Sequence, residues 1–418
     1  MTKHGLLNFM DVNKKETIKK LPNASVTTPK GYEAGGLFCG IRKKRLDMGW
    51  IYSQVPASAA GVYTTNLFQA APLLVTQESI GVENKLQGII VNSGKANACT
   101  GNQGLHDAYE MRSSFSKVLN INEHHAAVVS TGVIGEHLPM DKVKSGIDSI
   151  TLARDKVGVD EFEKAILTTD TCTKHFGVQL SINGEMVHIG GAAKGSGMIH
   201  PNMATMLAFV TTDANIPHPY LQQALSQVTN STFNQITVDG DTSTNDMVLL
   251  LANGLADTEP LTPEHPDWEV FFEGLKLVCQ ELSKQIARDG EGATKLIEVE
   301  VTGAATDNVA QAIGKSIVGS SLVKSAVFGT DANWGRIICA IGYSGQAINP
   351  NEVKVSIGPI TVVENGLPSP FDEFKAKEYL EQETIQLHIR VGNGSGKATC
   401  WGCDLSYDYV RINASYRT

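Results

Sequence analysis

The segment 194–209 contains a threonine that is placed to cleave the peptide bond in front of it. Glycine-rich sequence precedes the Ala204-Thr205 bond, and an apolar, strand-like run follows at 206–210. In this arrangement the threonine hydroxyl takes over the acyl group from its own nitrogen, and hydrolysis of the ester leaves Thr205 as a new N-terminus. Its freed α-amine, with an ordinary pKa of about 7.7–8.0, can act as general base for its own hydroxyl. Most Ala-Thr pairs are ordinary strand residues, so the pair alone leaves both interpretations open.

A second pair, Thr131-Gly132, follows the apolar run 126–131 at a junction between strand and turn. Nucleophilic attack creates an oxyanion that needs preorganised donors, and the loss of one donor typically costs about 2.7–4 kcal/mol in the barrier. The pair can offer a hydroxyl and an unhindered backbone N–H. An ordinary turn has the same pattern, so the spacing does not separate the two interpretations.

Alternating strands and helices are predicted to position these residues. Short apolar runs at 88–92 and 126–131, each ended by polar or glycine residues, are typical of buried strands. Asp160 has the position of an N-cap for a short helix at 161–167. Apolar residues recur every three or four positions over 268–288, which predicts a long helix with one buried face, ended by the glycine that follows Asp289.

The region after Leu296 is predicted to form a smaller, strand-rich unit. Apolar and polar residues alternate over 297–301 and again over 385–391, as in half-buried strands. The same alternation over 405–409 predicts that the C-terminal tail is docked as a strand. Residues 205–295 are expected to complete the main domain, and residues 296–418 to form the C-terminal α/β subdomain.

The composition is that of a soluble globular protein with more than one core. The chain has 418 residues, of which 42% are hydrophobic and 19% charged, and its formal net charge is -9. This charge argues against a nucleic-acid or anionic-membrane partner. The longest apolar runs, such as 247–252, are far shorter than the ~20 residues of a membrane span. The N-terminus matches neither a signal peptide nor a transit peptide, so a cytoplasmic protein is expected.

Two motifs resemble cofactor-binding sites but lack some of the residues that such sites require. Cys400 and Cys403 form a C-x-x-C pair among seven cysteines, but no second pair supplies a zinc site, so reduced thiols and no metal are expected. The glycine-rich stretch 391–398 lacks the first glycine and the hydroxyl residue of a P-loop. A turn after the 385–391 strand is the expected structure there.

The segment 194–214, KGSGMIHPNMATMLAFVTTDA, resembles the self-processing site of the ornithine acetyltransferase family, the acetyl-recycling enzymes of arginine biosynthesis. Several unrelated segments match the same family in order along the chain. They are 26–32 (VTTPKGY), 64–66 (TTN), 70–72 (AAP), 92–98 (NSGKANA), 130–135 (STGVIG), 168–171 (TTDT), 331–336 (DANWGR) and 401–405 (WGCDL). The resemblance runs from about residue 26 to residue 418, and it implies an αββα-type sandwich related to self-cleaving aminopeptidases.

The resemblance also implies roles for particular residues. Thr205 matches the family nucleophile, and Thr131 with Gly132 matches its oxyanion hole. The family binds its amino-acid substrate through the nucleophile and through residues that match Thr168, Lys194, Glu291, Asn413 and Thr418 in this chain. A carboxylate such as Glu291 can hold an ammonium group, and Lys194, with Thr168 or Thr418, can bind a carboxylate or polar end. As isolated residues, Lys194 and Glu291 have the pattern of solvated loop charges.

The implied reaction is a ping-pong transfer of acetyl from N2-acetylornithine to glutamate through an acetyl-threonyl ester. No metal or organic cofactor is expected, although acetyl-CoA is a candidate co-substrate. The chain is expected to split into residues 1–204 and 205–418, which remain together in an α2β2 heterotetramer. Two alternatives are open: an N-terminal-threonine amidase or aminopeptidase on the same scaffold, and a non-catalytic binding protein that is never processed.

Overall fold

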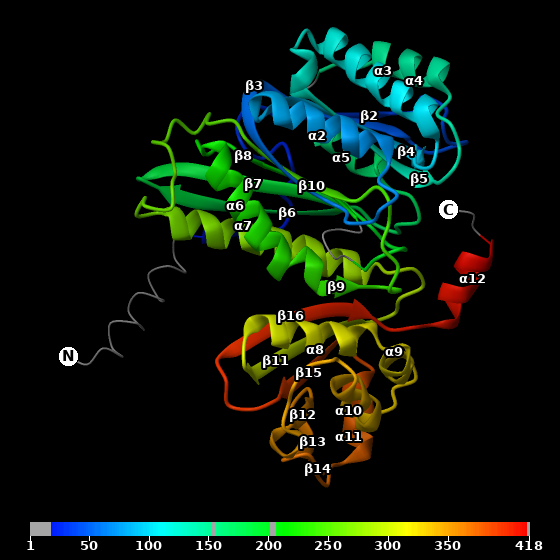
Figure 1. The fold of residues 1–418 in the computed structure, drawn as a ribbon, viewed down its shortest axis with the longest axis vertical. Coiled ribbons are helices and arrows are strands. Elements are labelled where there is room, and N and C mark those ends of the chain that lie inside the picture. The colour runs from blue at the N-terminus through cyan, green and yellow to red at the C-terminus, as the bar shows by residue number, and fades with distance from the viewer. Residues whose placement is uncertain (1–17, 153–155, 201–205, 416–418) are drawn as a thin grey trace.

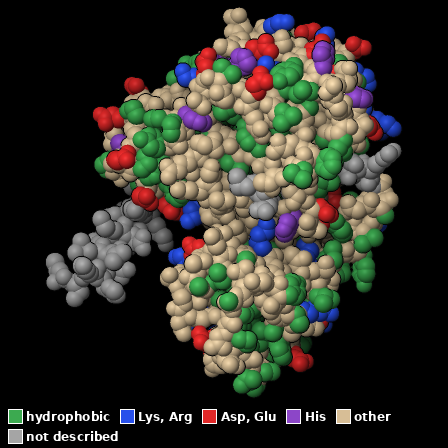
Figure 2. Space-filling model, viewed as in Figure 1, with side chains coloured by type: hydrophobic (Ala, Val, Ile, Leu, Met, Phe, Trp, Pro, Cys, Tyr) green, Lys and Arg blue, Asp and Glu red, His purple; other side chains and the backbone are tan. Residues whose placement is uncertain are grey.

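The computed structural model describes residues 18–152, 156–200 and 206–415. Ala204, Thr205 and Thr418, which the sequence places in the site, therefore lie outside the described residues. In the described part the chain forms two lobes, each built on its own β-sheet (Figure 1). Figure 2 shows in the same view that the molecule narrows between the lobes.

The larger lobe is built on a mixed sheet of nine described strands. Its order is β1 (Ile18–Leu21), β6 (Lys174–Ile182), β7 (Glu185–Lys194), β8 (Leu207–Thr212), β10 (Met247–Ala252), β3 (Met48–Tyr63), β4 (Lys85–Lys95) and β5 (Ala126–Val133), with β2 (Tyr32–Leu37) also paired to β3. The pairs β8–β10 and β4–β5 are parallel, and the other pairs are antiparallel. The 16-residue strand β3 joins the two halves of the sheet.

Helices pack against both halves of this sheet. They are α2 (Ala71–Glu83), α3 (Gly101–Leu119), α4 (Met140–Asp148), α5 (Lys156–Ala165), α6 (His218–Ser231) and α7 (Trp268–Arg288), with single 3-10 turns at Glu123–His125 and Phe233–Gln235. Of these, α6 and α7 pack on β3, β6 and β7, whereas α3 and α4 lie over β4 and β5 (Figure 1). Helix α5 packs against β2.

The alternation of side chains along the strands gives this lobe four layers. In β10, Val248 and Leu250 pack under α6 and α7, whereas Leu249 faces an inner core. In β4, Ile89 faces that same inner core, and Ile90 packs under α3 and α4. The two halves of the sheet therefore face each other across a shared core, with helices outside both. This confirms the predicted α/β class with an αββα arrangement.

The smaller lobe is built on a seven-stranded sheet of described residues. Its order is β14 (Leu367–Pro368), β13 (Ile360–Glu364), β12 (Lys354–Ile357), β15 (Thr384–Arg390), β11 (Leu296–Ala304), β16 (Gly396–Cys403) and β9 (Ile236–Thr237). Its helices are α8 (Asp307–Gly319), α9 (Ser321–Phe328), α10 (Trp334–Gly342) and α11 (Glu373–Leu380), with a 3-10 turn at Pro350–Glu352. Strand β9 precedes residue 296 in the chain, so the earlier part of the chain contributes to this sheet.

Several predicted elements are confirmed. The runs 88–92 and 126–131 lie in β4 and β5, the run 206–210 enters β8, and α7 spans 268–288. The alternating runs 297–301 and 385–391 correspond to β11 and β15, and the glycine-rich stretch after β15 is the connection to β16. All seven cysteines are free thiols.

The predicted start of the helix at 161 is wrong. Helix α5 begins at Lys156, so Asp160 lies within the helix and is not its N-cap. Val159 and Phe162 are both buried, and with Ile166 they form a stripe at helical spacing that begins one turn earlier than predicted.

The predicted C-terminal strand at 405–409 is also wrong, because Tyr407–Ser415 forms helix α12. The side chain of Ser406 accepts a hydrogen bond from the backbone N–H of Asp408 at 3.2 Å, as at the start of a helix. Tyr407 is 85% exposed, so the apolar side of the alternation is not buried as a strand would require. The tail is nevertheless attached to the body, because the Ser406 hydroxyl donates to the Gly292 carbonyl at 2.5 Å.

No helix among the described residues is long and apolar enough to cross a membrane.

Candidate active site

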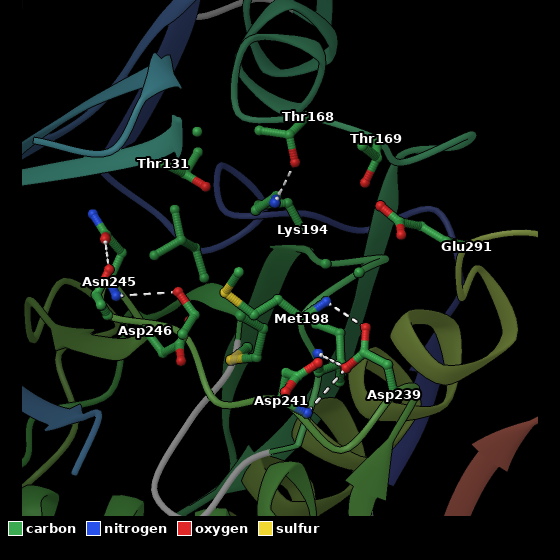
Figure 3. Close-up of a pocket in the computed structure, with 18 of the residues that line it drawn as sticks. Thr131, Thr168, Thr169, Lys194, Met198, Asp239, Asp241, Asn245, Asp246 and Glu291 are labelled. Carbon is green, nitrogen blue, oxygen red and sulfur yellow. Dashed lines mark hydrogen bonds between the residues drawn. The ribbon is translucent and has the colours of Figure 1, made fainter. Parts of the chain in front are cut away.

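One cavity of about 270 Å³ brings together every described residue that the sequence assigned to the site. Its walls include Thr131, Gly132, Thr168, Lys194, Glu291 and Asn413. These residues come from five separate segments of the chain. Figure 3 shows the side chains of Thr131, Thr168, Lys194 and Glu291 around a common space. Met206, which directly follows Thr205 in the sequence, also lines this cavity. Their individual roles remain predictions.

The Thr131-Gly132 pair lies near the end of β5, beside the end of β4. Gly132 pairs with Gly94 and has φ +133°, a conformation that L side chains rarely adopt. A methyl group at Gly132 would overlap the Gly94 backbone, so only glycine lets the two strand ends approach this closely. The glycine is therefore required by the backbone and not only by the predicted oxyanion hole.

Lys194 is the last residue of β7 and is buried, with 7% of the residue exposed. Its Nζ donates a hydrogen bond to Thr168 Oγ1 at 2.7 Å (Figure 3). It also lies 3.7 Å from an oxygen of Asp170. Lys194 is thus not a solvated loop charge, because it ends a strand, is buried and is bonded to Thr168 at the cavity wall.

Asp170 and its neighbours form a buried charged network behind this wall. Burial opposes the ionisation of Asp170, but the charges of Lys194 and Lys174 outweigh it and hold the pKa of the carboxyl well below its ordinary value. Burial likewise lowers the pKa of Lys174, yet Asp170 and Asp289 raise it above its ordinary value overall. Asp170 and Lys174 are therefore both charged at neutral pH.

Glu291 and Asn413 form the facing wall. Asn413, on α12, donates from Nδ2 to Glu291 Oε2 at 2.8 Å, so the C-terminal helix helps to orient the carboxylate. The backbone N–H of Glu291 donates to the Ser196 carbonyl at 3.1 Å. The carboxylate rests against Gly197, where any side chain would overlap it. Segments from both sides of the predicted cleavage bond therefore build this wall.

A set of acidic residues that was not predicted from the sequence lies on the remaining wall: Asp239, Asp241 and Asp246. Asp239 accepts hydrogen bonds from the backbone N–H groups of Met198 (2.6 Å) and Ile199 (2.8 Å). Burial raises the pKa of Asp239 above its ordinary value. Burial and the nearby carboxylates, Asp239 first, raise the pKa of Tyr409 to about 12. The sequence feature that could have indicated these residues is the acidic segment 239–246, DGDTSTND. It follows the two-residue strand β9, and it lacks the hydrophobic periodicity that would assign it to a helix or a strand.

The cysteine pair lies away from this cavity. Cys400 and Cys403 are buried in β16, and burial raises the pKa of the Cys400 thiol to about 12. Its sulfur contacts Gln235 Oε1 at 3.2 Å. Within the described ranges, the one group with the spacing of metal ligands is His106, Asp107 and Glu110 on α3, and it does not line the cavity.

The cavity thus combines hydroxyl and backbone groups at a strand end with an ammonium on one wall and carboxylates on the others. Such an arrangement suits a small molecule that carries both an ammonium and a carboxylate group, within an αββα scaffold.

The chain belongs to the ArgJ family, whose model matches residues 33–418. It is 59% identical to the arginine biosynthesis bifunctional protein ArgJ of Halalkalibacterium halodurans over 410 residues, which are 97% of this chain and 99% of that protein. The protein of the same name from Oceanobacillus iheyensis is 58% identical over 409 residues, 98% of this chain and 100% of that protein. A crystal structure of the arginine biosynthesis bifunctional protein argJ from Bacillus halodurans is 61% identical, with a TM-score of 0.50, and covers 51% of this chain and 100% of its own.

Proposed function

We propose that this chain transfers an acetyl group from N2-acetylornithine to glutamate, as a step of arginine biosynthesis. The observation that carries the proposal is the cavity that places Thr131 and Gly132 together with Lys194 and Glu291, next to Met206. The matched relatives are named as bifunctional arginine-biosynthesis proteins, which supports the pathway.

The proposed reaction has two half-reactions on Thr205. The free α-amine of Thr205 takes the proton of its hydroxyl, and the hydroxyl oxygen attacks the acetyl carbonyl of N2-acetylornithine. The Thr131 hydroxyl and the Gly132 N–H stabilise the oxyanion. Ornithine leaves with the proton, and the acetyl group remains as an ester on Thr205. The amine of glutamate then attacks this ester, which gives N-acetylglutamate and restores the hydroxyl.

The charges of the cavity support an amino-acid substrate. Lys194 is a point charge for the substrate carboxylate, with Thr168 beside it and Thr418 as a further proposed contact. Glu291, held by Asn413, binds an ammonium group. The acidic wall of Asp239 and its neighbours adds negative charge, which favours a substrate such as ornithine that carries a side-chain ammonium.

We also propose that the chain cuts itself between Ala204 and Thr205, and that the two products stay together. Strands β8 and β10 come from the second product, yet they lie between β7 and β3, which come from the first. Neither product can leave without breaking two strand pairings. The solved chain from Bacillus halodurans matches about half of the present chain over all of its own length, which supports a relative that exists as half-length chains. An α2β2 heterotetramer is the proposed assembly.

Acetyl-CoA is the proposed second acetyl donor, since the relatives are named bifunctional. We propose no other cofactor and no metal. The cytoplasm is the proposed location, where free amino acids and reduced thiols both occur.

The first test is the denatured intact mass of the wild type and of Thr205→Ala. Cleavage divides the 44.9 kDa chain into pieces of about 22 and 23 kDa in proportion to their residue numbers, whereas Thr205→Ala stays whole. Incubation with N2-acetylornithine and glutamate should then produce ornithine and N-acetylglutamate in equal amounts. A wild-type chain that stays uncut over days would leave a non-catalytic binding protein as the better interpretation. Release of acetate in place of N-acetylglutamate would identify the hydrolase alternative.

A further inference from the structure

Four charged side chains form a neutral cluster directly behind the cavity wall: Asp170, Lys174, Asp289 and Lys194. The exposed fractions of these side chains are 0%, 0%, 7% and 9%. Lys174 Nζ bridges the two carboxylates, at 2.8 Å from Asp170 and 2.6 Å from Asp289. Of the four, only Lys194 lines the cavity. The other three lie behind it and cannot touch a ligand there.

Asp170 contacts both residues that are proposed to bind the substrate carboxylate. Its Oδ2 accepts the backbone N–H of Thr168 at 2.9 Å and lies 3.7 Å from the ammonium of Lys194. Its Oδ1 accepts the backbone N–H of Gly195 at 2.6 Å, next to Lys194 in the chain. One carboxylate therefore fixes the backbone on both sides of the Thr168–Lys194 contact and attracts the lysine head group as well.

A lysine needs such support because its ammonium stands on a flexible four-carbon stem. One of its three N–H donors is bonded here to Thr168 Oγ1, and the ammonium lies 3.7 Å from an oxygen of Asp170. The ammonium can therefore still donate to a ligand in the cavity. Among the described residues, Asp170 is the carboxylate that forms an ion pair with Lys194.

We propose that Asp170 is a positioning residue of the acetyl-transfer reaction, which holds Lys194 and Thr168 in the orientation that receives the substrate carboxylate. Lys174 balances its charge from behind and is itself held by Asp289. The proposal rests on the proposed function, because it assigns to Asp170 the geometry of the same substrate site.

The test is the steady-state kinetics of Asp170→Asn with N2-acetylornithine. Asparagine keeps the size of aspartate and loses the charge that faces Lys194. A contact that stabilises the bound substrate and the transition state equally affects KM and not kcat. The loss of this charged contact should therefore raise KM by about ten- to a hundred-fold and change kcat by less than about threefold. An unchanged KM in the folded variant overturns the proposal.

A double variant separates positioning from support of the fold. Asp170→Asn with Lys174→Met removes one charge of each sign, so the buried cluster is neutral again and the unfolding temperature should recover. If Asp170 positions Lys194, KM stays raised in the double variant. If Asp170 only balances Lys174, KM returns to the wild-type value and the proposal is wrong. The double variant also serves if the single variant does not fold.

Asp213→Asn is the matched control. Asp213 is also buried and also accepts two backbone N–H groups, those of Lys30 (2.9 Å) and His188 (2.7 Å), but it does not line the cavity. A similar KM increase in this control would show a general effect of losing a buried carboxylate and would overturn the proposal. A wild-type protein without acetyl transfer would instead refute the proposed function, so the two failures are distinguishable.

Discussion

Substitution of Gly197 by alanine should weaken substrate binding while leaving the fold intact. An added methyl group at this position overlaps the carboxylate of Glu291, which is the far end of a flexible side chain. Gly197 is not among the glycines with positive φ, so alanine brings no backbone strain. The carboxylate must therefore move, and it leaves both its place at the cavity wall and the 2.8 Å hydrogen bond from Asn413.

The size of the effect follows from the lost contact. A hydrogen bond to a charged group contributes about 1.5–3 kcal/mol, so misplacing Glu291 should reduce kcat/KM by about 10- to 150-fold. The assay is acetyl transfer from N2-acetylornithine over a range of substrate concentrations, together with the thermal unfolding midpoint. We expect most of the loss in KM and little change in the unfolding midpoint.

Gly81→Ala is the control for this experiment. Gly81 lies within α2, and an added methyl group there meets no atom within 4 Å. Alanine in a helix interior is more stable than glycine by about 0.5–1 kcal/mol, so this variant should be slightly stabilised and fully active. Wild-type kinetics in Gly197→Ala would refute the reasoning that the position of the Glu291 carboxylate matters for the substrate.

Three further predictions concern the same cavity and its surroundings. Gly132→Ala should abolish transfer and destabilise the protein by about 1–3 kcal/mol, because the residue has φ +133° and an added methyl group overlaps Gly94. Thermal unfolding and the transfer assay measure the two effects, and a stable, active variant would contradict this prediction. Asn413→Ala removes the hydrogen bond that orients Glu291, so KM should rise by about five-fold, for about 1 kcal/mol, in the transfer assay; an unchanged KM would show that Glu291 is oriented by other contacts. The depressed pKa of Asp170 means that the stability it contributes is present above its unfolded pKa of about 3.9 and is lost as the pH falls below that value. The difference in free energy of unfolding between wild type and Asp170→Asn should therefore shrink below about pH 4 in urea titrations, and a constant difference would refute the pKa argument.

Elements with a long, regular pattern could be predicted from the sequence. Helix α7 has the predicted bounds because its apolar stripe continues for 21 residues, and β11 and β15 follow from their alternation. The tail could not be placed, because the alternating residues 405–409, the last three of which begin α12, fit a strand as well as an exposed first helical turn. Only the hydrogen bond to Gly292 and the exposure of Tyr407 decide between them, and both depend on tertiary structure.

The candidate site, like the fold, could be predicted only in part from the sequence. The resemblance named Thr168, Lys194 and Glu291, but spacing alone could not bring residues from distant segments to one cavity. Asp170 and Asp239 were not singled out because their environment is created by folding. Asp170 is charged and buried through Lys174, and Asp239 reaches the cavity because its loop follows the short strand β9.

The interleaved strands of the larger sheet determine when the proposed cleavage can occur. Residues 1–204 alone would leave β7 and β3 without the strands that separate them, so neither half contains a complete larger sheet. While the chain is whole the sheet forms within one molecule, so the proposed cleavage is expected to follow folding. Once the chain is cut, unfolding separates two chains, and refolding becomes a bimolecular reaction. The unfolding temperature of the cut protein should therefore rise with protein concentration. In the uncut Thr205→Ala variant, the unfolding temperature should depend on concentration only if whole chains associate with one another. A cut protein that has lost its fold would then have no efficient route back.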